Sequence, residues 1–233
     1  YSTKPAMRLL VFSFLSREWR ITVAAKKKSI STKEFIVMMA LLMSIVALSI
    51  DAMLPALGVI GGELKITNPN HAQYIIAFIF LGMTIGQLVW GPLSDDIGRR
   101  KVLYIGLAIY TVGSIICYMA HSLEIMLFGR LVQGFAVAGP NVATMAIVRD
   151  KYAGREMARI MSLVMMIFML VPAVAPAIGQ GVMLAASWRA IFLLYIAYGF
   201  VLSLWVYLRL EETLTKKNRV RLNLKNFAHG FKE

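Results

Sequence analysis

The stretch GPLSDDIGRRK, residues 91–101, joins two apolar runs of the chain, Gln73–Leu93 and Val102–Ala120. Each run is long enough to cross a bilayer, because a hydrocarbon core about 30 Å thick needs about 20 residues of α-helix. The joining stretch holds two glycines, which permit a tight turn and a close helix approach, and five charged side chains. These features predict two membrane-spanning helices with a charged connection between them.

Composition extends this interpretation to the whole chain. Of its 233 residues, 59% are hydrophobic and 16% are charged, and the mean hydropathy is +0.69. In an ordinary soluble domain about a quarter of the residues are charged. Four further runs are long and apolar enough to span a membrane: Phe35–Ala56, Leu123–Val148, Ile160–Leu184 and Trp188–Leu210. The sequence therefore predicts an all-α membrane protein with six transmembrane helices.

The distribution of Lys and Arg predicts the orientation of the spans, since cytoplasmic segments carry the excess of these residues. Of the 25, 22 lie in segments that share one side, Lys65 and Arg189 lie on the other, and Arg130 falls inside the fourth span. We therefore expect a multi-pass protein of the cytoplasmic (inner) membrane, with both termini in the cytoplasm and the lipid bilayer as a partner. This topology accounts for the formal charge of +13, so we expect no nucleic-acid partner.

Three segments are expected along the chain. They are a basic cytoplasmic N-terminal tail over residues 1–33, a six-helix transmembrane domain over 34–210 and a cytoplasmic linker over 211–233. In the tail, the apolar run Met7–Leu15 is too short to span, and it fits either an interfacial helix beside basic residues or a reading-frame extension. The single cysteine, Cys117, excludes a disulfide framework and a Cys-based zinc site, and we expect no metal site.

Two strongly ionic side chains fall well inside the predicted spans, Asp51 in the first and Arg130 in the fourth. Each costs about 2.5–3.5 kcal/mol at the centre of a membrane, so each is expected to face a cavity or a partner. They lie about 7–8 Å and about 10 Å below the outer ends of their helices, and therefore in one layer. They fit either a static ion pair between the two helices or a pair that handles a proton or a substrate.

Polar and small side chains continue along the face of the fourth span that carries Arg130. The positions that share this face of a helix hold Gln133, Gly134, Val137 and Asn141. Such a stripe fits helix-to-helix packing, and beside a buried arginine it also fits one wall of a wet cavity.

The fifth span carries a high density of residues that interrupt helices: Pro172, Pro176, Gly179 and Gly181. Neighbouring helices or water must satisfy the backbone groups that the prolines free. We expect a helix bend here, which serves either packing or a moving part.

The connection over residues 91–101 resembles the signature loop of the major facilitator superfamily, whose pattern is Gly-x-Leu-(small)-Asp-(basic)-x-Gly-Arg-(basic). The matching residues are Gly91, Leu93, Asp95, Gly98, Arg99 and Arg100. Asp96 stands where the family usually has a basic residue. The resemblance implies a cytoplasmic gate, in which the carboxylate is held by guanidinium groups and by a helix N-terminus in one state and released in the other.

Three more segments resemble the same family. Residues 130–134 (RLVQG) are similar to its fourth-span pattern Arg-x-x-Gln-Gly. Residues 172–179 (PAVAPAIG) are similar to its antiporter motif, with Ala175 and Gln180 in place of glycines. Residues 48–57 (LSIDAMLPAL) resemble the first span of its drug/proton antiporters of the bicyclomycin and chloramphenicol resistance group. The resemblance implies that Asp51 and Arg130 serve proton coupling.

Members of this family have twelve spans in two halves, and the resemblance covers the N-terminal half over roughly residues 35–215. It implies that spans 1–3 and 4–6 form two three-helix inverted repeats. It also implies a C-terminal six-helix half as a partner, in the same or another chain.

These observations predict proton-coupled efflux of drugs or other small amphipathic molecules, with the proton gradient as the energy source and no cofactor. Gln133, Asn141 and Met53 are the expected residues of the substrate cavity, since methionine adapts to varied ligands. A facilitator-type importer of a sugar or organic acid fits the same fold, and a truncated, transport-inactive product fits the chain as given. An intramembrane serine protease does not fit, because Ser114 lacks the following glycine of a nucleophile turn, so we expect no enzyme.

Overall fold

The computed structural model describes residues 30–66 and 68–214 of the chain. The expected interfacial helix of Met7–Leu15 and residues 215–233 of the expected linker lie outside the described residues. Contacts divide the chain into one unit over residues 1–31 and a second over 32–233. All the helices named below belong to the second unit.

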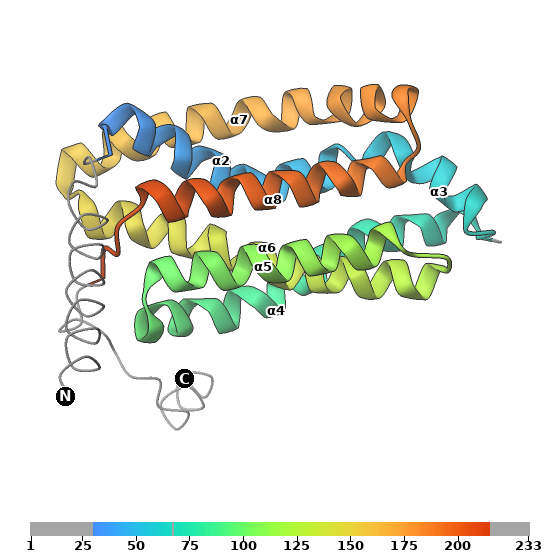
Figure 1. The fold of residues 1–233 in the computed structure, drawn as a ribbon, viewed down its shortest axis with the longest axis horizontal. Helices are drawn as coiled ribbons and strands as arrows, with labels where there is room; N and C mark the ends of the chain where they lie inside the picture. Colours follow the sequence, from blue (N-terminus) through green and yellow to red (C-terminus); the bar gives the residue numbers. More distant parts are fainter. Residues whose placement is uncertain (1–29, 67, 215–233) are drawn as a thin grey trace, which may run out of the picture. The chain divides into compact units, whose positions relative to one another are not determined.

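Six long helices lie side by side in Figure 1 and carry most of the described residues. They are α2 (Thr32–Asp51), α4 (Tyr74–Ile97), α5 (Arg99–Tyr118), α6 (Leu123–Lys151), α7 (Gly154–Ala185) and α8 (Arg189–Arg209). Short helical segments follow α2: η1 (Leu54–Ala56), α3 (Leu57–Glu63) and η2 (Pro69–Gln73). The described residues form no strand, and six helical segments are long and apolar enough to cross a membrane. The predicted all-α membrane fold with six transmembrane helices is therefore confirmed.

The signature stretch is more helical than a loop between spans would be. Helix α4 continues through Pro92 as far as Ile97, and α5 begins at Arg99. Gly98 alone separates the two helices, with φ at 102°, a conformation that residues with a side chain rarely adopt. So short a connection makes α4 and α5 antiparallel. We call the end of the bundle at which they meet the Gly98 end; α2 begins and α8 ends there.

The first span is longer than predicted and is interrupted. It does not end at Ala56: the helical region runs on through α3 to Glu63, and the regular α-helix stops at Asp51 before η1 begins. The cause is Pro55 inside η1, because a proline lacks the backbone N–H and its ring collides with the carbonyl four residues earlier. Asp51, the acidic residue within the first span, therefore lies at the end of α2.

The pattern of helix contacts is that of two inverted three-helix repeats. The first repeat consists of α2, α4 and α5, and the second of α6, α7 and α8. The first helix of each repeat packs on the second helix of the other: α2 on α7, and α6 on α4. The third helices, α5 and α8, pack on each other, and each also packs on the first helix of the other repeat. A two-fold axis in the membrane plane produces these pairings.

Two glycines let the paired helices touch backbone to backbone at equivalent points. A Cβ atom on Gly82 of α4 would collide with the carbonyl oxygen of Leu131, and a Cβ on Gly179 of α7 would collide with that of Ala52. Leu131 directly follows Arg130, and Ala52 directly follows Asp51. The two contacts therefore relate Asp51 and Arg130 as corresponding positions of the two repeats.

A substitution at Gly179 tests this close contact. Gly179→Ala is expected to lower the thermal unfolding midpoint of the purified chain, because forced overpacking typically costs about 1–3 kcal/mol. Gly181→Ala on the same helix is the matched control, since a Cβ there would meet no atom within 4 Å. The same midpoint in both variants would contradict the packing described here.

Candidate functional site

The break in the first span leaves the backbone carbonyl of Ser49 without its usual helical donor. The Ala52 amide donates to Leu48 O (3.2 Å), as in a regular helix, whereas the Met53 amide donates to Ile50 O (3.2 Å) instead of Ser49 O. Ser49 is fully buried, so its carbonyl needs a partner from another part of the fold.

Arg130 of α6 supplies a partner for this carbonyl. Its Nη1 donates to Ser49 O at 3.0 Å and to Gln133 Oε1 at 3.0 Å, and its guanidinium carbon lies 5.5 Å from the centre of the Phe192 ring. The side chain is completely buried, and its Nε and Nη2 have no hydrogen-bond partner among the described residues. A buried cation is costly unless it is compensated, and among the described residues the compensation comes from Ser49 O, Gln133 and the Phe192 ring.

Further hydrogen bonds surround the contact between Arg130 and Ser49 O. Gln133 Nε2 donates to Ser114 Oγ (2.7 Å), and Ser114 Oγ donates to Tyr110 O (2.8 Å). The Tyr110 hydroxyl pairs with Ser49 Oγ (2.7 Å), and the Tyr195 hydroxyl of α8 lies 3.3 Å from Ser49 O. We call Ser49, Tyr110, Ser114, Arg130, Gln133 and Tyr195 the Ser49 cluster. Sequence analysis found only Arg130 and Gln133, because serines and tyrosines in an apolar run carry no signal of their own.

Asp51 lies next to the Ser49 cluster without joining it by an ion pair. It is the last residue of α2 and is partly exposed. No ion pair among residues 30–66 and 68–214 links it to Arg130, so the direct pairing considered from their depths is not formed. Arg130 instead contacts the backbone carbonyl of Ser49, two residues before Asp51.

The other expected cavity residues separate in the structure. Met53 is fully buried beside the helix break, and Gln133 belongs to the Ser49 cluster. Asn141 lies further along α6 and lines a cavity of about 460 Å³ near the Gly98 end, together with Met145 and Gly91.

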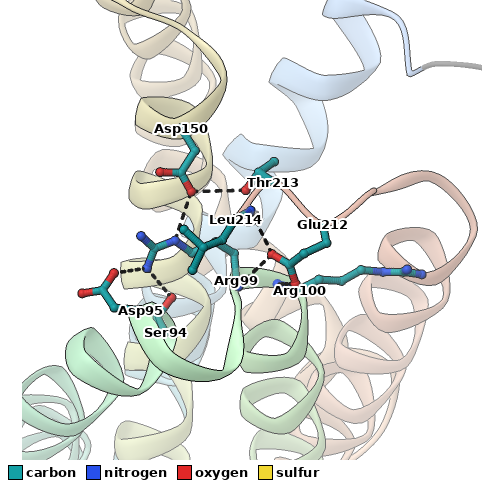
Figure 2. A network of polar contacts seen from close by, with 8 residues as sticks. All are labelled: Ser94, Asp95, Arg99, Arg100, Asp150, Glu212, Thr213 and Leu214. Carbon is teal, nitrogen blue, oxygen red and sulfur yellow. Dashed lines mark hydrogen bonds and ion pairs between the residues drawn. The ribbon is translucent and has the colours of Figure 1, made fainter. Parts of the chain in front are cut away.

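The signature residues form a second polar cluster, shown in Figure 2. Arg99 Nη1 contacts Asp95 Oδ1 at 2.6 Å and donates to Ser94 Oγ at 2.9 Å. Its Nε donates to Asp150 Oδ2 at 3.1 Å. Arg99 therefore ties the end of α4 to the end of α6, while about half of the Asp95 side chain remains exposed.

The segment after α8 returns to the same cluster, as Figure 2 shows. Glu212 accepts hydrogen bonds from the backbone amides of Arg99 (3.0 Å) and Arg100 (3.2 Å), and Thr213 Oγ1 donates to Asp150 Oδ2 (3.3 Å). A carboxylate at the N-terminus of a helix satisfies amides that lack helical partners and meets the positive end of the helix dipole. Sequence analysis assigned Glu212 to a linker and did not assign Asp150 a role.

Helix α7 carries the remaining predicted site residues. It is one continuous α-helix from Gly154 to Ala185 that passes through Pro172 and Pro176. Gly179 is buried where α7 crosses Ala52, one residue after Asp51. The face of this helix that carries Gly179 therefore lies against the interrupted part of the first span.

Comparison with known proteins assigns these features to a family. The family model described as the Major Facilitator Superfamily matches residues 35–232. An MFS-type transporter of Bacillus subtilis, YdgK, is 35% identical over 175 residues, which are 74% of this chain and 43% of that protein. A bicyclomycin resistance protein homolog of Haemophilus influenzae is 31% identical over 201 residues, which are 86% of this chain and 50% of that protein. The multidrug resistance protein MdtL of Klebsiella pneumoniae is 32% identical over 146 residues, 62% of this chain and 37% of that protein.

A solved structure supports the fold independently. The human organic anion transporter MFSD10 superimposes with a TM-score of 0.67 at 18% sequence identity, over 86% of this chain and 53% of that one. The chain thus spans about half the length, or less, of the proteins that it matches.

The helix cap formed by Glu212 can be tested directly. Glu212→Ala is expected to lower the unfolding midpoint of the chain, because loss of an N-terminal cap costs typically about 1 kcal/mol, and to speed amide exchange in the first turn of α5. The matched control is Glu211→Ala, since the Glu211 side chain is exposed. Equal stability and exchange in the two variants would refute the cap.

Proposed function

Because the chain belongs to the Major Facilitator Superfamily, we propose that it forms the N-terminal half of a proton-coupled exporter of drugs or other small amphipathic molecules. The names of two relatives, a bicyclomycin resistance protein homolog and a multidrug resistance protein, support this cargo class. The other half is a C-terminal six-helix domain, in the same or another chain. The protein lies in the cytoplasmic membrane with the Gly98 end and both termini in the cytoplasm.

The observation that carries this proposal is the state of Asp51. A carboxylate at an interrupted transmembrane helix, partly exposed and without an ion pair in the described part of the chain, can bind and release a proton. A carboxylate locked to Arg130 would lose that freedom, since the guanidinium is always charged.

Arg130 supplies a fixed positive charge beside this proton site. Its contacts to Ser49 O and Gln133 keep it buried whether Asp51 is charged or neutral. When Asp51 is ionised, the two charges nearly cancel within the membrane. When Asp51 takes up a proton from outside, the net charge of the two groups rises by one unit, and this favours rearrangement of the bundle and release of the cargo.

The second polar cluster, centred on Arg99, provides the gate in this scheme. Arg99 holds Asp95 and Asp150, and Glu212 holds the start of α5. The cavity lined by Asn141 and Met145 opens beside these ion pairs. Breaking the contacts of Arg99 would separate α4 from α6 at the cytoplasmic end, and the proton gradient would drive the cycle without a cofactor.

The test is the Asp51→Asn substitution in cells that express the chain together with its C-terminal half. Asparagine keeps the size of the side chain and cannot carry the proton. We expect proton-driven efflux of ethidium and resistance to bicyclomycin and chloramphenicol to fall to the level of cells without the gene, with the amount of protein unchanged.

Glu124→Gln is the control, since Glu124 is an exposed carboxylate in the first turn of α6. It should transport as the wild type does. Unchanged efflux in Asp51→Asn would overturn the role of Asp51. Gradient-driven uptake of a sugar or organic acid, without resistance to bicyclomycin and chloramphenicol, would overturn both the proposed direction of transport and the proposed class of cargo.

A further inference from the structure

Two tyrosines of α8 hold backbone carbonyls of α2, and they do so at different heights. The Tyr195 hydroxyl, which is fully buried, lies 3.3 Å from both Leu48 O and Ser49 O. The Tyr198 hydroxyl, one helical turn further on, donates to Leu41 O at 2.9 Å. The two side chains thus make the same kind of bond, one beside the helix break and one more than two turns before it.

The carbonyl of Ser49 differs from that of Leu41 in its place in the helix. Leu41 lies in the middle of α2, whereas Ser49 lies in the last turn, whose carbonyls lack the full set of helical donors. A carbonyl oxygen has two lone pairs, and at Ser49 these meet Arg130 Nη1 and the Tyr195 hydroxyl. Donors from α6 and α8 therefore fix the direction of the last peptide groups of α2.

We propose that Tyr195 is a positioning residue for Asp51: by holding the Leu48 and Ser49 carbonyls, it fixes the last turn of α2 and so the place of the carboxylate at its end. The proposal rests on the proposed function in that Asp51 is taken as the proton site. Tyr195 does not touch the proton. It acts through the backbone, two residues before Asp51.

The Tyr110 hydroxyl adds a third anchor at the same residue. It pairs with Ser49 Oγ at 2.7 Å, and that oxygen also donates to Ile45 O at 2.6 Å. This contact holds the side chain of Ser49, while Tyr195 and Arg130 hold its carbonyl. Removing the Tyr195 hydroxyl should therefore loosen the segment after Ser49 and leave the rest of α2 in place.

The experiment compares Tyr195→Phe with Tyr198→Phe in the 233-residue chain in lipid nanodiscs. Both variants lose a phenol hydroxyl of α8 that bonds to backbone carbonyls of α2, so a purely structural role predicts similar effects. Amide hydrogen exchange is measured over residues 50–57, which contain the break. We expect exchange there to be about fivefold faster in Tyr195→Phe, the factor expected for loss of one neutral hydrogen bond, and unchanged in Tyr198→Phe.

A second readout reports on the carboxyl group itself. Dicyclohexylcarbodiimide modifies protonated carboxyl groups in apolar surroundings, and the Asp51→Asn variant identifies the modified site. Modification of Asp51 should slow about fivefold in Tyr195→Phe, because a loosened turn lets the carboxyl reach water, and should keep its rate in Tyr198→Phe.

Equal exchange over residues 50–57 in the two tyrosine variants, or an unchanged rate of Asp51 modification in Tyr195→Phe, would overturn the positioning role. Neither readout requires transport. A negative result for Tyr195 would therefore not decide the proposed function, which the efflux test of Asp51→Asn examines separately.

Discussion

The hydrogen bond from Arg130 to the carbonyl oxygen of Ser49, 3.0 Å long, is the contact on which the membrane-embedded part of the site depends. It exists because Pro55 interrupts the first span and the Met53 amide turns to Ile50 O. The carbonyl that loses its helical donor offers a buried guanidinium an acceptor that carries no full charge. The guanidinium of Arg130 is thus held inside the bundle without an ion pair to Asp51.

The repeat architecture explains why these groups meet at one level. The first helix of each repeat crosses the second helix of the other at a glycine, Gly179 over Ala52 and Gly82 over Leu131. These crossings fix the heights of the residues just before Ala52 and Leu131, one acidic and one basic. At the Gly98 end a separate set of contacts, centred on Arg99, ties α4, α5, α6 and the segment after α8 together. One cluster therefore surrounds the buried guanidinium of Arg130 between the helices, while the other links the helices at the Gly98 end.

Much of this fold could be predicted from the sequence, since six long apolar runs and the stretch GPLSDDIGRRK each have one straightforward interpretation. Whether Asp51 pairs directly with Arg130 could not be predicted from the sequence, because depth along a helix does not give the direction of a side chain. In addition, the acceptor that Arg130 contacts is the backbone carbonyl of Ser49, which a sequence pattern does not reveal. Tyr195 looks like any aromatic residue of an apolar run. Glu212 lies far in sequence from the amides that it caps, so only the return of the chain after α8 reveals its role.

The most direct test of the central claim is the infrared difference spectrum of the chain in lipid between high and low pH. It detects protonation of carboxyl groups without a cargo or a second half. If Asp51 is the proton site beside a buried and separately held Arg130, acidification should produce a protonated-carboxyl band that is missing in Asp51→Asn and present in Glu124→Gln. A spectrum of Asp51→Asn that matches the wild type would contradict the claim that this carboxylate carries the proton.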